Sequence, residues 1–113
     1  MASQFLPIAS IQALDTLFER SFTEPIVIFK HSNSCGTSAY VYEIMSEVPG
    51  VIHLVTVQES RDISNAIAER TGIRHQTPQA FVIINGEIAY SSSHYNISPQ
   101  TITDKISKLS TIN

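Results

Sequence analysis

The chain has 113 residues, of which 42% are hydrophobic and 15% charged, and its formal net charge is −3. This length predicts a single domain, residues 1–113, that buries one core without metal ions or disulfides. A lone cysteine excludes an internal disulfide, and the lack of a basic excess argues against a nucleic-acid partner. The stretch 1–8 does not resemble a secretory signal, and no apolar run is long enough to span a membrane. We therefore expect a cytoplasmic protein without membrane contact, in which a thiol stays reduced.

The first predicted elements are a helix and a buried strand. Ser10 is placed to cap a helix that ends before Pro25. The apolar face of this helix consists of Ile11, Leu14, Leu17 and Phe18. The almost entirely apolar run Ile26–Phe29 is typical of a strand that is buried on both faces. Helices are therefore expected on either side of the sheet.

A second helix and a second strand are predicted after Cys35. The helix begins near Gly36 and runs to about Val48, where Pro49 and Gly50 stop it. Its inward-facing residues are expected to be Tyr40, Val41, Ile44 and Met45. The segment 51–57 is the next strand.

A third helix and a β-hairpin follow. Ser60 is placed to cap the helix, and Gly72 is placed to end it in a left-handed conformation. Strands at 80–84 and 87–91 flank Asn85-Gly86, a pair that readily adopts the two positive φ angles of a tight hairpin turn. This pair is the strongest local structural signal in the chain.

The final predicted element is a helix that opens at Ser98-Pro99, with proline at its tolerated first position. The residues spaced to dock this helix on the sheet are Ile102, Ile106 and Leu109. Helical crossovers join strands in parallel, whereas the hairpin adds an antiparallel pair. The predicted fold class is α/β, with a central mixed sheet of about four strands flanked by helices on both faces.

Cys35 is the strongest candidate for chemistry, because it lies where the first predicted strand runs into a helix. The first turn of a helix presents unpaired N–H groups and the positive end of the peptide dipole. A thiol held there tends to ionise and become nucleophilic. Without this context, a lone cysteine is usually only a small apolar core residue.

Five short segments carry a family resemblance. They are, in chain order, Phe29-Lys30-His31-Ser32, Cys35 with Ser38, His75–Phe81, Asn85-Gly86 and Ser93–Ile97. Together they resemble the monothiol bacilliredoxins, also called YtxJ-like general stress proteins, which have a thioredoxin-like fold. The resemblance covers nearly the whole chain.

The resemblance implies removal of a low-molecular-weight thiol, bacillithiol or a glutathione-type thiol, from S-thiolated client proteins, with no tightly bound cofactor. Cys35 is then the nucleophile. Ser38 occupies the position of the resolving cysteine of dithiol relatives, and it is able to donate a weak hydrogen bond to the thiolate. The implied substrate-binding residues are Gly36, Thr37, Thr77 and Pro78, with Pro78 after a cis peptide bond. Thr77 is expected to offer backbone groups to an extended client segment.

Gly36 and two histidines leave the properties of the thiol open, and a metal site is not expected. Gly36 stands where many relatives have proline, which leaves the loop freer. His31 and His75 border the expected site, where a protonated imidazole would favour the thiolate, but either could be an ordinary surface residue. The scattered histidines and single cysteine lack the paired spacing of a metal site.

Two other functions compete with the enzyme. In one, the domain is a non-catalytic adaptor that binds proteins through the Thr77-Pro78 groove while Cys35 stays inert or senses oxidants. In the other, the protein is a structural stress protein without thiol chemistry.

Overall fold

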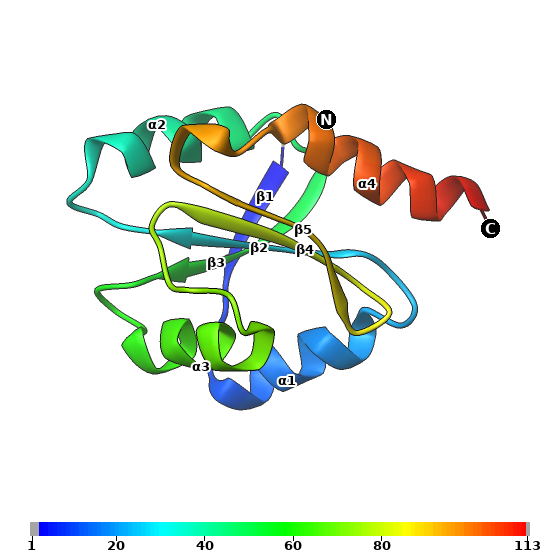
Figure 1. Cartoon of the computed structure of the whole chain (residues 1–113), viewed down its shortest axis with the longest axis horizontal. Coiled ribbons are helices and arrows are strands. Elements are labelled where there is room, and N and C mark those ends of the chain that lie inside the picture. Colours follow the sequence, from blue (N-terminus) through cyan, green and yellow to red (C-terminus); the bar gives the residue numbers. More distant parts are fainter. Residues whose placement is uncertain (1–2, 113) are drawn as a thin grey trace.

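The computed structural model describes the backbone of residues 3–112 and the side chains of residues 3–107. Its elements are β1 (Ser3–Pro7), α1 (Ile11–Arg20), β2 (Ile26–His31), α2 (Gly36–Met45), β3 (Gly50–Thr56), α3 (Arg61–Thr71), β4 (Gln79–Ile84), β5 (Glu87–Ser93), a short 3₁₀ turn η1 (His94–Asn96) and α4 (Pro99–Ile112), as Figure 1 shows. No helix within the described part of the chain is both long and apolar enough to cross a membrane.

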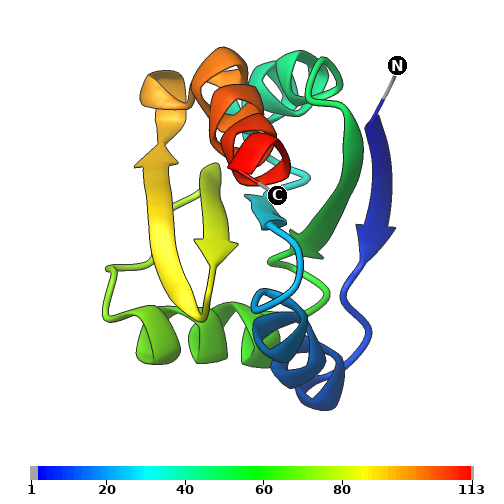
Figure 2. The same ribbon diagram turned by 90° about the vertical axis from the view of Figure 1, so that its right-hand side faces the viewer.

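The strands form one mixed sheet in the order β1-β3-β2-β4-β5. Strands β1 and β2 run parallel to β3, whereas β4 is antiparallel to both β2 and β5. Helices α2 and α4 cover one face of the sheet, and α1 and α3 cover the other (Figures 1 and 2). The structure thus confirms the predicted mixed sheet with helices on both faces.

The sheet has five strands, and β1 was not predicted from the sequence. Residues Ser3–Pro7 are mostly exposed or half-buried, so they lack a strong hydrophobic alternation. β1 lies at the edge of the sheet beside β3, and Pro7 ends it. An edge strand tolerates proline because one side of its backbone needs no partner in the sheet.

Strand β2 is buried on both faces, as its apolar sequence predicts. Ile26 and Ile28 belong to the core under α1 and α3, whereas Val27 and Phe29 belong to the core under α2 and α4. Successive side chains of a strand point to opposite faces, so one strand supplies both cores. The same central strand leads directly into the segment that carries Cys35.

Of the predicted capping and turn residues Ser10, Ser60, Gly72, Asn85 and Gly86, all but Ser60 behave as expected. The hydroxyl of Ser10 accepts a hydrogen bond from the backbone N–H of Ala13 at 3.0 Å, and Gly72 ends α3 with φ +71°. Asn85 and Gly86 adopt φ angles of +54° and +76° in the hairpin turn. Ser60 occupies the cap position of α3, but its side chain makes no capping hydrogen bond.

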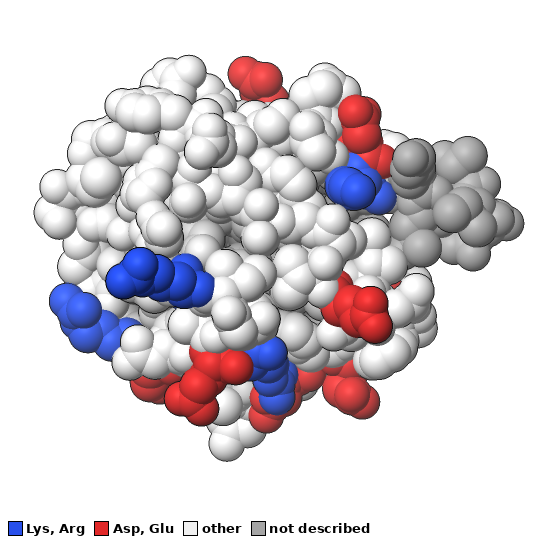
Figure 3. Space-filling view, in the orientation of Figure 1, with Lys and Arg blue, Asp and Glu red and all other residues white. Residues whose placement is uncertain are grey.

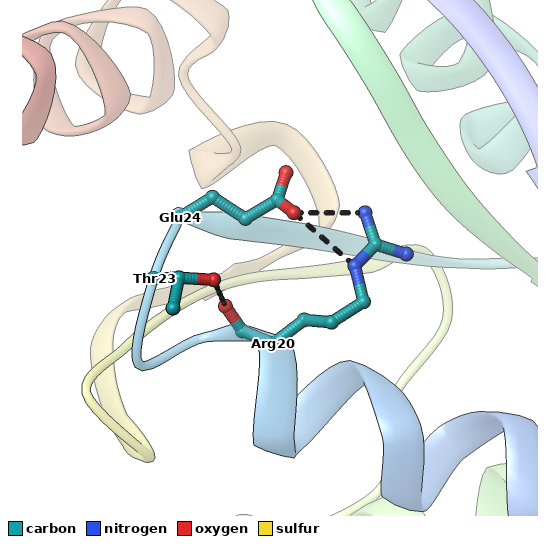
Figure 4. Close-up of polar contacts among 3 residues, drawn as sticks. All are labelled: Arg20, Thr23 and Glu24. Carbon is teal, nitrogen blue, oxygen red and sulfur yellow. Dashed lines mark hydrogen bonds and ion pairs between the residues drawn. The ribbon is translucent and has the colours of Figure 1, made fainter.

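The connection from α1 to β2 is closed by local contacts. Arg20 donates to the Glu24 carboxylate at 3.1 and 3.2 Å, and the Thr23 hydroxyl donates to the Arg20 carbonyl (Figure 4). Ser21 then joins this connection to the distant hairpin, because it accepts hydrogen bonds from the N–H groups of Asn85 and Gly86. The exposed ion pair adds little stability, whereas the buried Ser21 fixes the position of the hairpin.

Helix α2 differs from its prediction in two ways. It ends at Met45, three residues before the expected end at Val48. Tyr40 was expected to face the core, but it is 53% exposed, while Val41 and Met45 are buried. In α1, Ile11 is likewise exposed. The predicted docking residue Leu109 of α4 lies outside the residues whose side chains are described.

Candidate functional site

Cys35 is the N-cap residue of α2, and its thiol is half-buried. Its backbone is extended, with φ −116° and ψ 124°, and its carbonyl accepts the first helical hydrogen bond from Ala39 N–H at 3.0 Å. The Cys35 side chain makes no capping hydrogen bond in the structure. The sulfur therefore lies at the N-terminus of a ten-residue helix, where the dipole favours negative charge.

Ser38 lies on the buried face of α2, with no exposed surface. Its hydroxyl oxygen accepts a hydrogen bond from the backbone N–H of Ser32 at 2.9 Å and lies 2.8 Å from Nδ1 of His31. Among the described residues, these are its hydrogen-bond partners, and the expected bond to the Cys35 sulfur is not formed. Ser38 thus joins the start of α2 to the end of β2 and the loop after it.

His31 packs between the sheet and α2, with its ring 4.9 Å from the ring of Tyr42. Burial lowers the pKa of His31, so its imidazole is neutral at neutral pH. The neutral ring shares a hydrogen bond with the Ser38 hydroxyl through Nδ1. Stabilisation of the Cys35 thiolate by the charge of His31 requires a protonated ring, and the lowered pKa of His31 opposes this protonation.

His75 contacts the side chains of Lys30 and Ser64, at 3.1 and 3.3 Å from its Nδ1. Burial lowers the pKa of His75, and the positive charges of Lys30 and Arg61 lower it further. His75 is therefore neutral at neutral pH and accepts a hydrogen bond from the Lys30 ammonium. A protonated His75 acting on the thiolate is opposed by these contacts as well.

Lys30 is fully buried at the end of β2. Burial lowers its pKa from 10.5 to about 8. Among the described residues, its hydrogen-bond partner is the neutral His75, and no carboxylate forms an ion pair with it. The protein therefore retains a buried cation at the end of the strand that leads to Cys35, although burial without a counter-ion is unfavourable.

Thr77 and Pro78 lie at the same end of the sheet as Cys35. Lys30, near the end of β2, pairs with Gln79, which directly follows Pro78. The peptide bond between Thr77 and Pro78 is cis, and the Pro78 carbonyl accepts a hydrogen bond from His94 N–H at 2.9 Å. The loop that contains Thr77 is thus held beside the loop that precedes α2.

Gly36 and Thr37 begin α2. A side chain added at Gly36 would meet nothing within 4 Å, so the space beside Cys35 is open. The Thr37 hydroxyl donates to the hydroxyl of Tyr95 at 3.3 Å, and the exposed Tyr95 ring lies 5.9 Å from that of Tyr40. In Figure 3, the surface over the start of α2 and the end of β5 is formed mainly by uncharged side chains. The Thr37 hydroxyl thus joins the first turn of α2 to η1.

Gln58 is a site residue that the sequence did not suggest. It follows β3, and its side-chain amide bonds to the loop 32–34 directly before Cys35. The predicted strand order could have indicated Gln58, because β2 and β3 are parallel and their carboxyl ends must meet at one edge of the sheet. A search of the described residues finds no group of three or more His, Cys, Asp or Glu side chains that could hold a metal ion.

Comparisons with known proteins bear on the family and the fold. The family model described as monothiol bacilliredoxin BrxC matches residues 6–102. A solved structure described provisionally as an oxidoreductase with a thioredoxin fold is 28% identical in sequence, with a TM-score of 0.79. The match covers 88% of this chain and 91% of that protein's chain. Thioredoxins from Malassezia sympodialis and Schistosoma mansoni have 18% and 19% identity and TM-scores of 0.68. The match covers 93% of this chain in both cases, and 90% and 97% of theirs, and shows the fold alone.

Proposed function

Because the chain belongs to the monothiol bacilliredoxin family, we propose that it removes bacillithiol from mixed disulfides on client proteins, with Cys35 as the nucleophile. The family and the thioredoxin fold support a thiol oxidoreductase role. The observation that carries the one-cysteine mechanism is the position of Cys35 at the start of α2, with a buried serine, Ser38, three residues further on.

The proposed reaction has two exchange steps. In the first, the Cys35 thiolate attacks the small-thiol sulfur of the client disulfide, a new disulfide forms at Cys35, and the client leaves as a thiolate. In the second, a thiolate of free bacillithiol attacks the sulfur that Cys35 carries. Cys35 leaves as a thiolate, and bacillithiol disulfide is the oxidised product. The client disulfide is thus reduced at the expense of free small thiols.

The surroundings of Cys35 support distinct roles for its neighbours. The open space at Gly36 and the polar side chain of Thr37 accommodate the small thiol. In this proposal, the backbone of Thr77, before Pro78, pairs with an extended client segment. Ser38 acts through its bonds to His31 and Ser32, which hold the first turn of α2.

The test is the rate at which the protein releases small thiol from one client protein prepared in bacillithiolated and in glutathionylated form. We expect faster release from the bacillithiolated client, and loss of release from both in the Cys35→Ser variant. Faster release from the glutathionylated client would reject bacillithiol as the co-substrate. Release that persists in Cys35→Ser would reject the mechanism. Client binding without release by either protein would support the adaptor instead.

A further inference from the structure

Gln58 forms three hydrogen bonds to the segment directly before Cys35. Its amide nitrogen donates to the hydroxyl oxygens of Ser32 and Ser34 at 2.8 and 3.1 Å. Its amide oxygen accepts from the backbone N–H of Asn33 at 3.1 Å. One side chain therefore contacts three consecutive residues of the loop and uses both N–H donors and the acceptor of its amide.

The loop depends on side chains for its backbone hydrogen bonds. The N–H of Ser32 donates to Ser38, that of Asn33 donates to Gln58, and that of Ser34 donates to the Ser32 hydroxyl at 3.4 Å. Proline would stiffen such a loop, but the sequence from β2 to the start of α2 contains none. The order of this loop therefore comes from hydrogen bonds to the side chains of Ser32, Ser38 and Gln58.

Gln58 is itself anchored to the central sheet. It follows Val57, whose N–H donates to the carbonyl of His31 at 2.9 Å, so the chain after β3 stays beside the end of β2. The side chain reaches from this rigid edge across to the loop. By contrast, Gly36 on the other side of Cys35 has open space around it and gives no support.

We propose that Gln58 is a positioning residue for thiol exchange, which holds the loop 32–34 so that the Cys35 sulfur stays at the N-terminus of α2. The expected effect of Gln58 on thiol transfer rests on the proposed function. Exchange requires a thiolate to reach a disulfide sulfur in the correct orientation, and misplacement by about 1 Å costs up to about a hundredfold in rate. Gln58 acts through the loop and does not touch the reacting sulfurs.

The test compares Gln58→Met, which keeps the length of the side chain but removes its hydrogen bonds, with Gln12→Met at an exposed position of α1. We expect Gln58→Met to transfer the small thiol about tenfold more slowly. We also expect alkylation of Cys35 by a small electrophile at one fixed pH to become slower, and amide hydrogen exchange at Asn33 to become faster. Gln12→Met should match the parent protein in all three measurements. Equal behaviour of the two variants would overturn the proposal.

A double-mutant cycle adds a second test. Ser32→Ala removes one partner of Gln58, so the combined variant should be hardly slower than the worse of the two single variants. Fully additive losses would show that Gln58 acts outside this network and would overturn the proposal. The alkylation and exchange measurements do not require a client protein. If the parent protein transferred no small thiol, the proposed function would fail while the role of Gln58 in holding the loop could still be decided.

Discussion

At the scale of single residues, Ser38 shows how the structure changes an expectation drawn from sequence. Its position relative to Cys35 suggested a hydroxyl that bonds to the thiolate. In the structure the hydroxyl instead accepts from Ser32 N–H and contacts His31. The Ser38 hydroxyl is thus engaged by two neighbours other than the Cys35 sulfur. Ser38 therefore organises the residues around the thiol, and its effect on the thiol is indirect.

The structure predicts that Ser38→Ala mainly lowers stability. It would leave the buried N–H of Ser32 and Nδ1 of His31 without their partner, at a cost of about 1–3 kcal/mol in the free energy of unfolding. Urea unfolding measures this loss. Ser46→Ala, at the exposed end of the same helix, is the control and should change stability by less than about 0.5 kcal/mol. A loss no larger than that of the control would contradict the buried role of Ser38.

Lys30 carries a cost in stability that depends on pH. Its pKa is about 8 in the folded protein and 10.5 when exposed to water. Below pH 8 the lysine is charged in both states, so the burial penalty is fully present. Between pH 8 and 10.5 the unfolded chain binds more protons, and folding stability therefore rises with pH. The penalty at pH 7 is on the order of 1–3 kcal/mol.

Lys30→Met should therefore stabilise the protein at pH 7, by about 1–3 kcal/mol, because methionine fills a similar volume without a buried charge. The gain should shrink as the pH approaches 10. Urea unfolding of both proteins at pH 7 and at pH 10 tests this. A Met variant that is less stable at pH 7 would show that the Lys30–His75 hydrogen bond outweighs the cost of burial. An equal gain at both pH values would contradict the lowered pKa of Lys30.

The sequence could place Cys35 and Ser38 in the site but could not identify Gln58 or the contacts of Lys30. The first two follow from local order, since a strand runs into a helix. The contacts of Gln58 and Lys30 join residues 24 to 45 positions apart in the chain. Such contacts depend on which strands are neighbours and in which register, and local patterns do not determine this.

At the scale of elements, the predictions were best where a turn or a cap requires particular residues. Asn85-Gly86 formed the predicted hairpin, and Gly72 ended α3. The missed strand β1 and the outward-facing Tyr40 have a common cause. β1 is held by its pairing with β3, and Tyr40 contacts Tyr95 in η1, so both depend on distant partners.

The hairpin gives a prediction for Gly86→Ala. Gly86 has φ +76°, which is unfavourable for alanine, and the added carbon would lie 2.8 Å from the ring of Phe22. The exposed ring is free to move, so backbone strain dominates, and we expect a loss of about 1–2 kcal/mol. Gly36→Ala is the matched control, because it lies in a helix with open space around it. It should raise stability by about 0.5 kcal/mol. Equal effects of the two substitutions in thermal unfolding would refute this account.

At the scale of the whole molecule, the sheet brings the site together at one end. The parallel strands β2 and β3 both end there, and antiparallel β4 begins there. The loop before Cys35, Gln58 and Thr77-Pro78 follow or precede these strand ends. The α/β order predicted from sequence was sufficient to expect this arrangement in outline. The hydrogen bonds that hold the loop in place became visible only in the folded chain.

The most direct test of the central claim is the intact mass of the reduced protein after mixing with a client that carries one bacillithiol mixed disulfide. The account predicts a mass gain of one bacillithiol on Cys35, with an equal amount of client released as free thiol, and no gain in Cys35→Ser. An unmodified protein beside an unchanged client, or a disulfide between Cys35 and the client itself, would contradict the claim that Cys35 takes up the small thiol.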